Sequence, residues 1–141
     1  MTPTLLGRWQ TRIFLLATVG FLVSLPFGQL SAFLVLFYIG LFGLAWDVLY
    51  NFLQTILWDH DWPGVFQFLA AIVEAIWLIL VINIIGLPFL GSGSFDLGIF
   101  IRHYTVVSIA TYLFSWVVMR LLFPRWRFRG GEWLGKWLST P

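Results

Sequence analysis

The sequence predicts an all-α integral membrane protein with four transmembrane helices and a short amphipathic C-terminal helix on the membrane surface. Of its 141 residues, 60% are hydrophobic and only 10% are charged. An ordinary soluble domain carries about 25% charged residues, so this chain has too few charges to cover a water-facing surface. Its length accommodates about four spans of about 20 residues each, and we therefore expect residues 1–141 to form a single polytopic domain.

Turn-forming residues divide the chain into four apolar runs. The breaks contain proline, glycine and polar side chains at residues 26–29, 58–64 and 91–94. The predicted spans are residues 5–25, 30–57, 65–89 and 96–123, followed by a tail at 124–141. The first run also resembles a secretory signal peptide, but Leu30 is a poor fit where a small residue is expected before the cleavage point. We therefore expect the first helix to be retained.

The distribution of basic residues predicts the orientation. Seven of the eight Lys and Arg lie near the ends, within residues 8–12 and 120–136. Four spans place both ends on one side, so the positive-inside rule predicts cytoplasmic N- and C-termini in an inner membrane. It places the acidic loop at residues 58–64 on the same side. Tryptophans also gather at the predicted inner interface: Trp9, Trp46, Trp58, Trp62, Trp126, Trp133 and Trp137.

Polar residues inside two of the apolar runs form the candidate intramembrane site. Asp47, Asn51 and Gln54 have i, i+4 and i+7 spacing, which places them on one face of the second helix. Gln67 and Glu74 share one face of the third helix in the same way. Around the connecting loop Gln54 mirrors Gln67 and Asp47 mirrors Glu74, so an antiparallel hairpin brings each pair to a similar depth. The spacing predicts a polar seam between the two helices.

The seam has two interpretations that the sequence leaves open. A carboxylate facing hydrocarbon costs at least about 2.5 kcal/mol, so Asp47 and Glu74 should face protein, water or each other. Two carboxyl groups in one poorly solvated place do not both ionise cheaply, which is how a proton or cation site is built. The structural alternative is that these groups lie close to the interface, where amides and carboxylates simply bond across helices.

Two other polar groups are weaker candidates. Asp59, His60 and Asp61 are potential metal ligands, but adjacent residues of one loop do not all converge on one ion without a ligand from elsewhere. A solvated turn that caps the third helix explains them without chemistry, so we expect no metal and no other cofactor. Arg102 and His103 near the outer start of the fourth helix are interpreted as ordinary interfacial residues.

The C-terminal tail has a pattern typical of membrane surfaces. Basic and aromatic residues alternate, and Trp133 and Trp137 then recur at helical spacing. The rings enter the interface while the guanidinium groups meet anionic headgroups, so the tail predicts a lipid contact rather than nucleic-acid binding. The predicted membrane-surface residues are Arg125, Trp126, Arg127, Phe128, Arg129, Trp133 and Trp137.

Function is the least determined property of the sequence. The absence of cysteine excludes disulfides and thiolate chemistry, and no phosphate loop, zinc-spaced histidine pair or nucleophile elbow is present. We therefore expect an accessory, assembly or interaction subunit that contacts the bilayer and either a membrane-protein partner or its own copies. The alternative is a small oligomeric proton or cation carrier or channel that uses the intramembrane carboxylates. A membrane enzyme with a metal in the 59–61 loop ranks third.

Overall fold

A computed structural model describes residues 5–58, 62–90 and 95–122, which are helical apart from their connections. They form four long apolar helices, each long enough to cross a membrane, at Leu5–Phe27, Leu30–Ile56, Gly64–Ile84 and Leu97–Leu122. Many of their large hydrophobic side chains are exposed, as expected of helices whose solvent is lipid. These features fit an integral multi-pass membrane protein.

The first and last long helices are each built from several segments. The first comprises α1 (Leu5–Leu15), the π-helical η1 (Leu16–Gly20), α2 (Phe21–Ser24) and the 3₁₀-helical η2 (Leu25–Phe27). The second and third are single helices, α3 (Leu30–Ile56) and α4 (Gly64–Ile84). The last comprises α5 (Leu97–Leu113), the π-helical η3 (Phe114–Val118) and α6 (Met119–Leu122).

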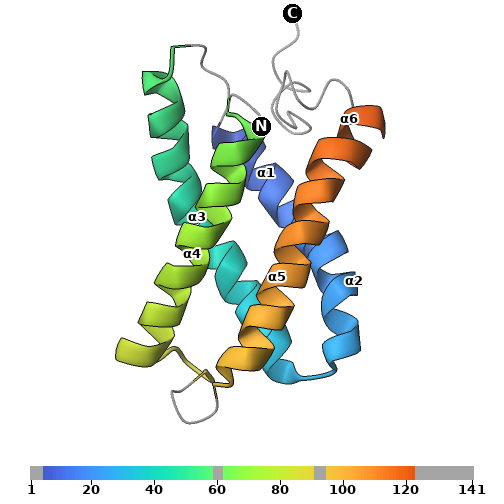
Figure 1. Ribbon diagram of the computed structural model, residues 1–141, viewed down its shortest axis with the longest axis vertical. Coiled ribbons are helices and arrows are strands. Elements are labelled where there is room, and N and C mark those ends of the chain that lie inside the picture. Colours follow the sequence, from blue (N-terminus) through green and yellow to red (C-terminus); the bar gives the residue numbers. More distant parts are fainter. Residues whose placement is uncertain (1–4, 59–61, 91–94, 123–141) are drawn as a thin grey trace, which may run out of the picture.

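The helices alternate in direction, so the bundle has two distinct ends (Figure 1). The start of α1, the end of α3, the start of α4 and the end of α6 lie at what we call the Leu5 end. The turn before α3, the end of α4 and the start of α5 lie at the opposite, Gly28 end. The apolar core comprises Val35, Tyr38, Ile39, Leu78, Ile82, Leu90, Phe100 and Tyr104.

The π-turn in the first helix brings its polar residues onto one face. Twelve residues separate Arg12 from Ser24, so a regular helix would place their side chains about 120° apart. A single π-turn absorbs one extra residue, which reduces this angle to about 20°. Both residues accordingly face the bundle: Arg12 contacts α3 and α4, and Ser24 contacts α5.

Three helix ends fall within two residues of the predicted boundaries, but α4 ends at Ile84 rather than at Phe89. Gly86 has a left-handed backbone with φ of 74°, and the N–H groups of Ile85 and Gly86 both donate to the carbonyl of Val81. This glycine-terminated C-cap stops the helix before the apolar sequence does. The predicted C-terminal amphipathic helix and the candidate ligands Asp59, His60 and Asp61 lie outside the described residues.

Candidate functional site

Arg12 joins the two intramembrane carboxylates in the interior of the bundle. Its Nε and Nη2 donate to Oδ2 and Oδ1 of Asp47 at 2.8 and 2.9 Å. Its Nη1 and Nη2 donate to Oε2 and Oε1 of Glu74 at 3.0 and 3.1 Å. One guanidinium therefore ties α1 to both α3 and α4 through four charge-assisted bonds. We call Arg12, Asp47 and Glu74 the arginine clamp.

The clamp is almost completely removed from solvent. The side chain of Asp47 is 0% exposed, and those of Glu74 and Arg12 are 10% and 14% exposed. An isolated charge in this environment is costly, which is why intramembrane charges pair with one another. The planar guanidinium suits this position because its fixed fork of donors matches two carboxylates at once.

A second arginine completes the charge balance around the clamp. Arg8 lies one helical turn before Arg12, is 0% exposed, and donates from Nη2 to Oε1 of Gln54. Its guanidinium lies 4.9 Å from the ring centroid of Trp62 and interacts electrostatically with Asp47. Two arginines and two carboxylates have a formal net charge of zero, so the bundle encloses a neutral group of charges.

Gly43 provides the space in which Arg12 crosses α3. A Cβ atom at this position would lie 2.5 Å from Cζ and 2.8 Å from Cδ of Arg12. Real Cβ atoms essentially never approach other atoms so closely, so any larger residue has to push the guanidinium away from the carboxylates. The glycine thus has a specific role in positioning the clamp, beyond general helix contact.

The structure divides the predicted seam among different helices. Asp47 and Glu74 meet, but through Arg12 rather than directly. Gln54 binds Arg8 of α1, whereas Gln67 accepts from Nε1 of Trp116 at 2.8 Å and donates to Oγ of Ser115 at 3.3 Å. The two glutamines, which lie at equal distances from the connecting loop in the sequence, therefore bind different helices and not each other. Asn51 is half-buried on α3.

A cavity of about 500 Å³ lies beside the clamp. Its exposed lining residues, such as Phe68, Ile72, Thr105 and Ile109, all lie on α4 and α5, so the cavity opens on the side of these two helices. Figure 1 shows α1 behind these two helices. Most of the lining is apolar, and α1 and α3 contribute Arg12 and Asp47 to its inner wall. Polar side chains also lie toward the Leu5 end, where Gln67, Thr111 and Tyr112 line the cavity. Its volume is in the range of about 300–1,000 Å³ that is typical of ligand pockets.

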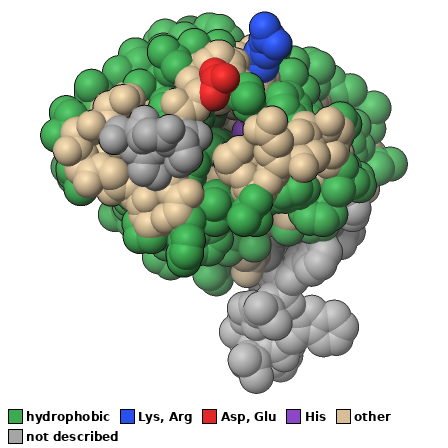
Figure 2. Space-filling model, turned by 90° about the horizontal axis from the view of Figure 1, so that it is seen from below, with side chains coloured by type: hydrophobic (Ala, Val, Ile, Leu, Met, Phe, Trp, Pro, Cys, Tyr) green, Lys and Arg blue, Asp and Glu red, His purple; other side chains and the backbone are tan. Residues whose placement is uncertain are grey.

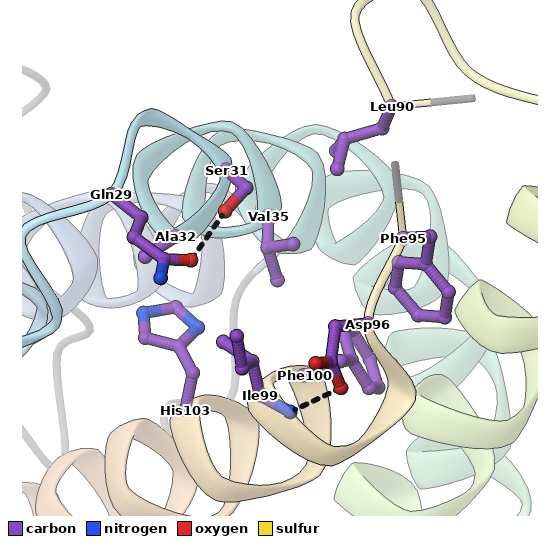
Figure 3. Close-up of a pocket in the computed structure, with 10 residues that line it drawn as sticks. All are labelled: Gln29, Ser31, Ala32, Val35, Leu90, Phe95, Asp96, Ile99, Phe100 and His103. Carbon is purple, nitrogen blue, oxygen red and sulfur yellow. Dashed lines mark hydrogen bonds between the residues drawn. The ribbon is translucent and has the colours of Figure 1, made fainter. Parts of the chain in front are cut away.

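A smaller pocket of about 80 Å³, with both polar and apolar lining residues, lies at the Gly28 end. Figure 2 looks onto this end and shows a histidine recessed near the middle of a mostly hydrophobic face, with an acidic side chain close by. In Figure 3 the ring of His103 points toward Gln29 and Ala32, with Asp96 across the pocket. Oδ1 of Asp96 accepts from the N–H groups of Gly98 and Ile99, so this carboxylate is the N-cap of α5.

His103 is buried, not interfacial as predicted, and fastens α5 to α2. Its Nε2 lies 2.7 Å from Oγ of Ser24, and that hydroxyl donates to the carbonyl of Gly20 at 2.7 Å. The ring therefore donates from Nε2 to the serine. Because Ser24 is 0% exposed, this serine and histidine form a structural pair and not an accessible nucleophile.

No group of three or more His, Cys, Asp or Glu side chains among the described residues is arranged to hold a metal ion. Sequence reasoning missed Arg8 and Arg12, which it assigned to the cytoplasmic flank. The sequence contains a signal for Arg12. Arg12 and Asp47 lie at similar distances along the chain from the turn at Gly28, so an antiparallel pair of helices brings them to a similar level. No protein-family model, curated protein or solved structure matches this chain, so the functional argument depends on the geometry of the site.

Proposed function

We propose that this chain is an accessory or assembly subunit in the membrane, whose task is to bind a larger membrane-protein partner rather than to catalyse or transport. The observation that carries the proposal is the arginine clamp. Arg12 bonds all four carboxylate oxygens of Asp47 and Glu74, so these charged side chains bind one another inside the bundle. The remaining described surface is chiefly apolar helix, suited to contacts within the bilayer plane.

The proton or cation carrier is the second candidate, and the cavity favours it. Asp47 and Glu74 both line a space of about 500 Å³. A transported cation, however, would have to displace Arg12 from four bonds, and the neutral charge balance gives it no excess negative charge to bind. A proton that binds either carboxylate would likewise have to compete with the guanidinium of Arg12, which already bonds all four carboxylate oxygens.

Site-specific photocrosslinking tests the accessory proposal. One crosslinkable residue is placed on an exposed position of each helix, at Ile13, Phe52, Ile76 and Val117. A docked partner covers one side of the bundle, so we expect one or two of these positions to crosslink to the same larger membrane protein. Crosslinks only to lipid or to further copies of this chain would contradict the proposal.

Flux measurements separate the two candidates. Vesicles that contain the purified protein should show no pH-driven or cation-driven flux above empty vesicles. If they do show flux, and if Asp47→Asn or Glu74→Gln abolishes it in a protein that remains folded, the carrier replaces the accessory subunit as the correct function. These substitutions keep size and hydrogen bonding while they remove the charge.

We also propose that the Leu5 end faces the cytoplasm. Arg8 and Arg12 are inside the bundle and no longer count as flanking charges. Arg120 and the four basic residues of the tail still outnumber Arg102, which is at the other end. Single cysteines at Ser94 and Ser139 should therefore react with impermeant reagents from opposite sides of the membrane, and the chain has no native cysteine to interfere. Labelling of both from one side would reject this topology.

A further inference from the structure

The hydrogen bonds between α4 and the last long helix, made by α5 and η3, determine what fits into the large cavity. The hydroxyl of Tyr104 donates to the carbonyl of Ala71 at 2.7 Å, and Nε1 of Trp116 donates to Gln67 at 2.8 Å. The two helices are thus tied together at two levels beside the opening. A transmembrane helix with its side chains is about 10–12 Å across, so it would have to break both ties to enter. A single hydrocarbon chain is much narrower.

A basic side chain lies near the polar end of the cavity. Gln67 and Tyr112 line this end, and Trp116 binds Gln67. Arg120 lies one turn further along, with its Cζ 4.6 Å from the ring centroid of Trp116. This arginine is exposed, and it lies near the Leu5 end of the last candidate span, Leu97–Leu122. An exposed guanidinium at this level is suited to bind a phosphate group.

We propose that the cavity holds one acyl chain of an anionic phospholipid whose phosphate pairs with Arg120. The acyl chain contacts the apolar walls contributed by α4 and α5, and it covers the 14% of the Arg12 side chain and the 10% of the Glu74 side chain that are still exposed. The neutral charge balance of the inner wall suits an uncharged occupant. The lipid would then be a structural component of the bundle, which goes beyond the accessory role proposed above and does not depend on it.

Native mass spectrometry of the full chain tests this site. Protein purified in mild detergent is stripped of lipid and given equal amounts of a phosphatidylglycerol and a phosphatidylcholine. We expect one retained phospholipid per chain and a preference of about fivefold for phosphatidylglycerol, the effect expected of one basic residue. Arg120→Gln should abolish the preference, whereas Arg102→Gln, an exposed arginine at the other end, should leave it unchanged.

The acyl-chain half of the proposal needs a variant that fills the cavity. Ala71→Trp places a large ring in the space and keeps the carbonyl that Tyr104 binds, and Ser108→Leu fills it from α5 if the first variant misfolds. Both should lose the retained lipid, and Ala45→Trp on the exposed face of α3 should keep it. No retained lipid in the unsubstituted protein, or equal retention in a folded Ala71→Trp, would overturn the proposal. A stoichiometric protein partner that Ala71→Trp displaces, without any lipid, would also overturn it.

Discussion

Replacing Arg12 by methionine should be among the most destabilising substitutions in this protein. The change removes four hydrogen bonds and leaves Asp47 and Glu74, which are 0% and 10% exposed, without their shared counter-ion. Removal of one partner from a buried ion pair costs about 3–5 kcal/mol. The equilibrium constant for unfolding should therefore rise by between about two and four orders of magnitude.

The measurement is reversible unfolding of the purified protein in lipid bicelles. Arg102→Met is the matched control, because this exposed arginine is part of no described ion pair, and surface substitutions usually change stability by less than about 0.5 kcal/mol. If Arg12→Met changes the free energy of unfolding no more than Arg102→Met does, the arginine clamp does not stabilise the bundle as its geometry indicates.

A double variant tests the charge balance itself. Arg12→Met with Glu74→Gln removes one charge of each sign and leaves one arginine, Arg8, and one carboxylate, Asp47, which interact electrostatically. The double variant should therefore be more stable than Arg12→Met alone, which is the sign of coupling expected for two members of one ion pair. A double variant that is less stable than either single variant would contradict this reasoning. It would mean that Glu74 stabilises the bundle through the geometry of its hydrogen bonds and not through its charge.

Three further predictions concern other contacts. Gly43→Ala should lower the melting temperature because it displaces the guanidinium of the clamp, whereas Gly40→Ala, with its nearest atom at 3.5 Å, should be tolerated; equal effects would contradict the close approach. Ser24→Ala should cost about 1–3 kcal/mol because it leaves a buried ring N–H without an acceptor, and Thr18→Ala on the exposed face should cost much less. A peptide of residues 125–138 should bind anionic vesicles and lose affinity as salt rises; equal binding to zwitterionic vesicles at low salt would remove the electrostatic contribution.

The sequence predicts the helices well because lipid imposes a simple requirement on them. A span needs a long apolar run, and such runs are visible without any knowledge of packing. The predicted end of α4 was wrong because apolar residues continue beyond the helix, whereas the left-handed backbone at Gly86 ends it. Hydropathy carries no information about that backbone conformation.

The candidate site was harder to predict than the helices. The periodicity of Asp47 and Glu74 marks residues that should avoid lipid, but it does not say which helix supplies their partner. Arg12 was interpreted as a flanking charge because basic residues near a helix start commonly lie in the headgroup region. The interpretation fails because two acceptors inside the bundle offer its guanidinium four bonds there.

The position of the clamp constrains the order of events when the chain is made. The helix that carries Arg8 and Arg12 leaves the ribosome before α3 and α4, so its arginines enter the membrane system before their carboxylates exist. Each unpaired arginine at the bilayer centre costs about 2.5–3.5 kcal/mol on the insertion scale. Arg8 lies near the start of α1 and Arg12 one helical turn later, and the long side chains of arginine can extend toward the headgroups in the meantime. The first helix can therefore reach its final position only after α4, which carries Glu74, has been synthesised.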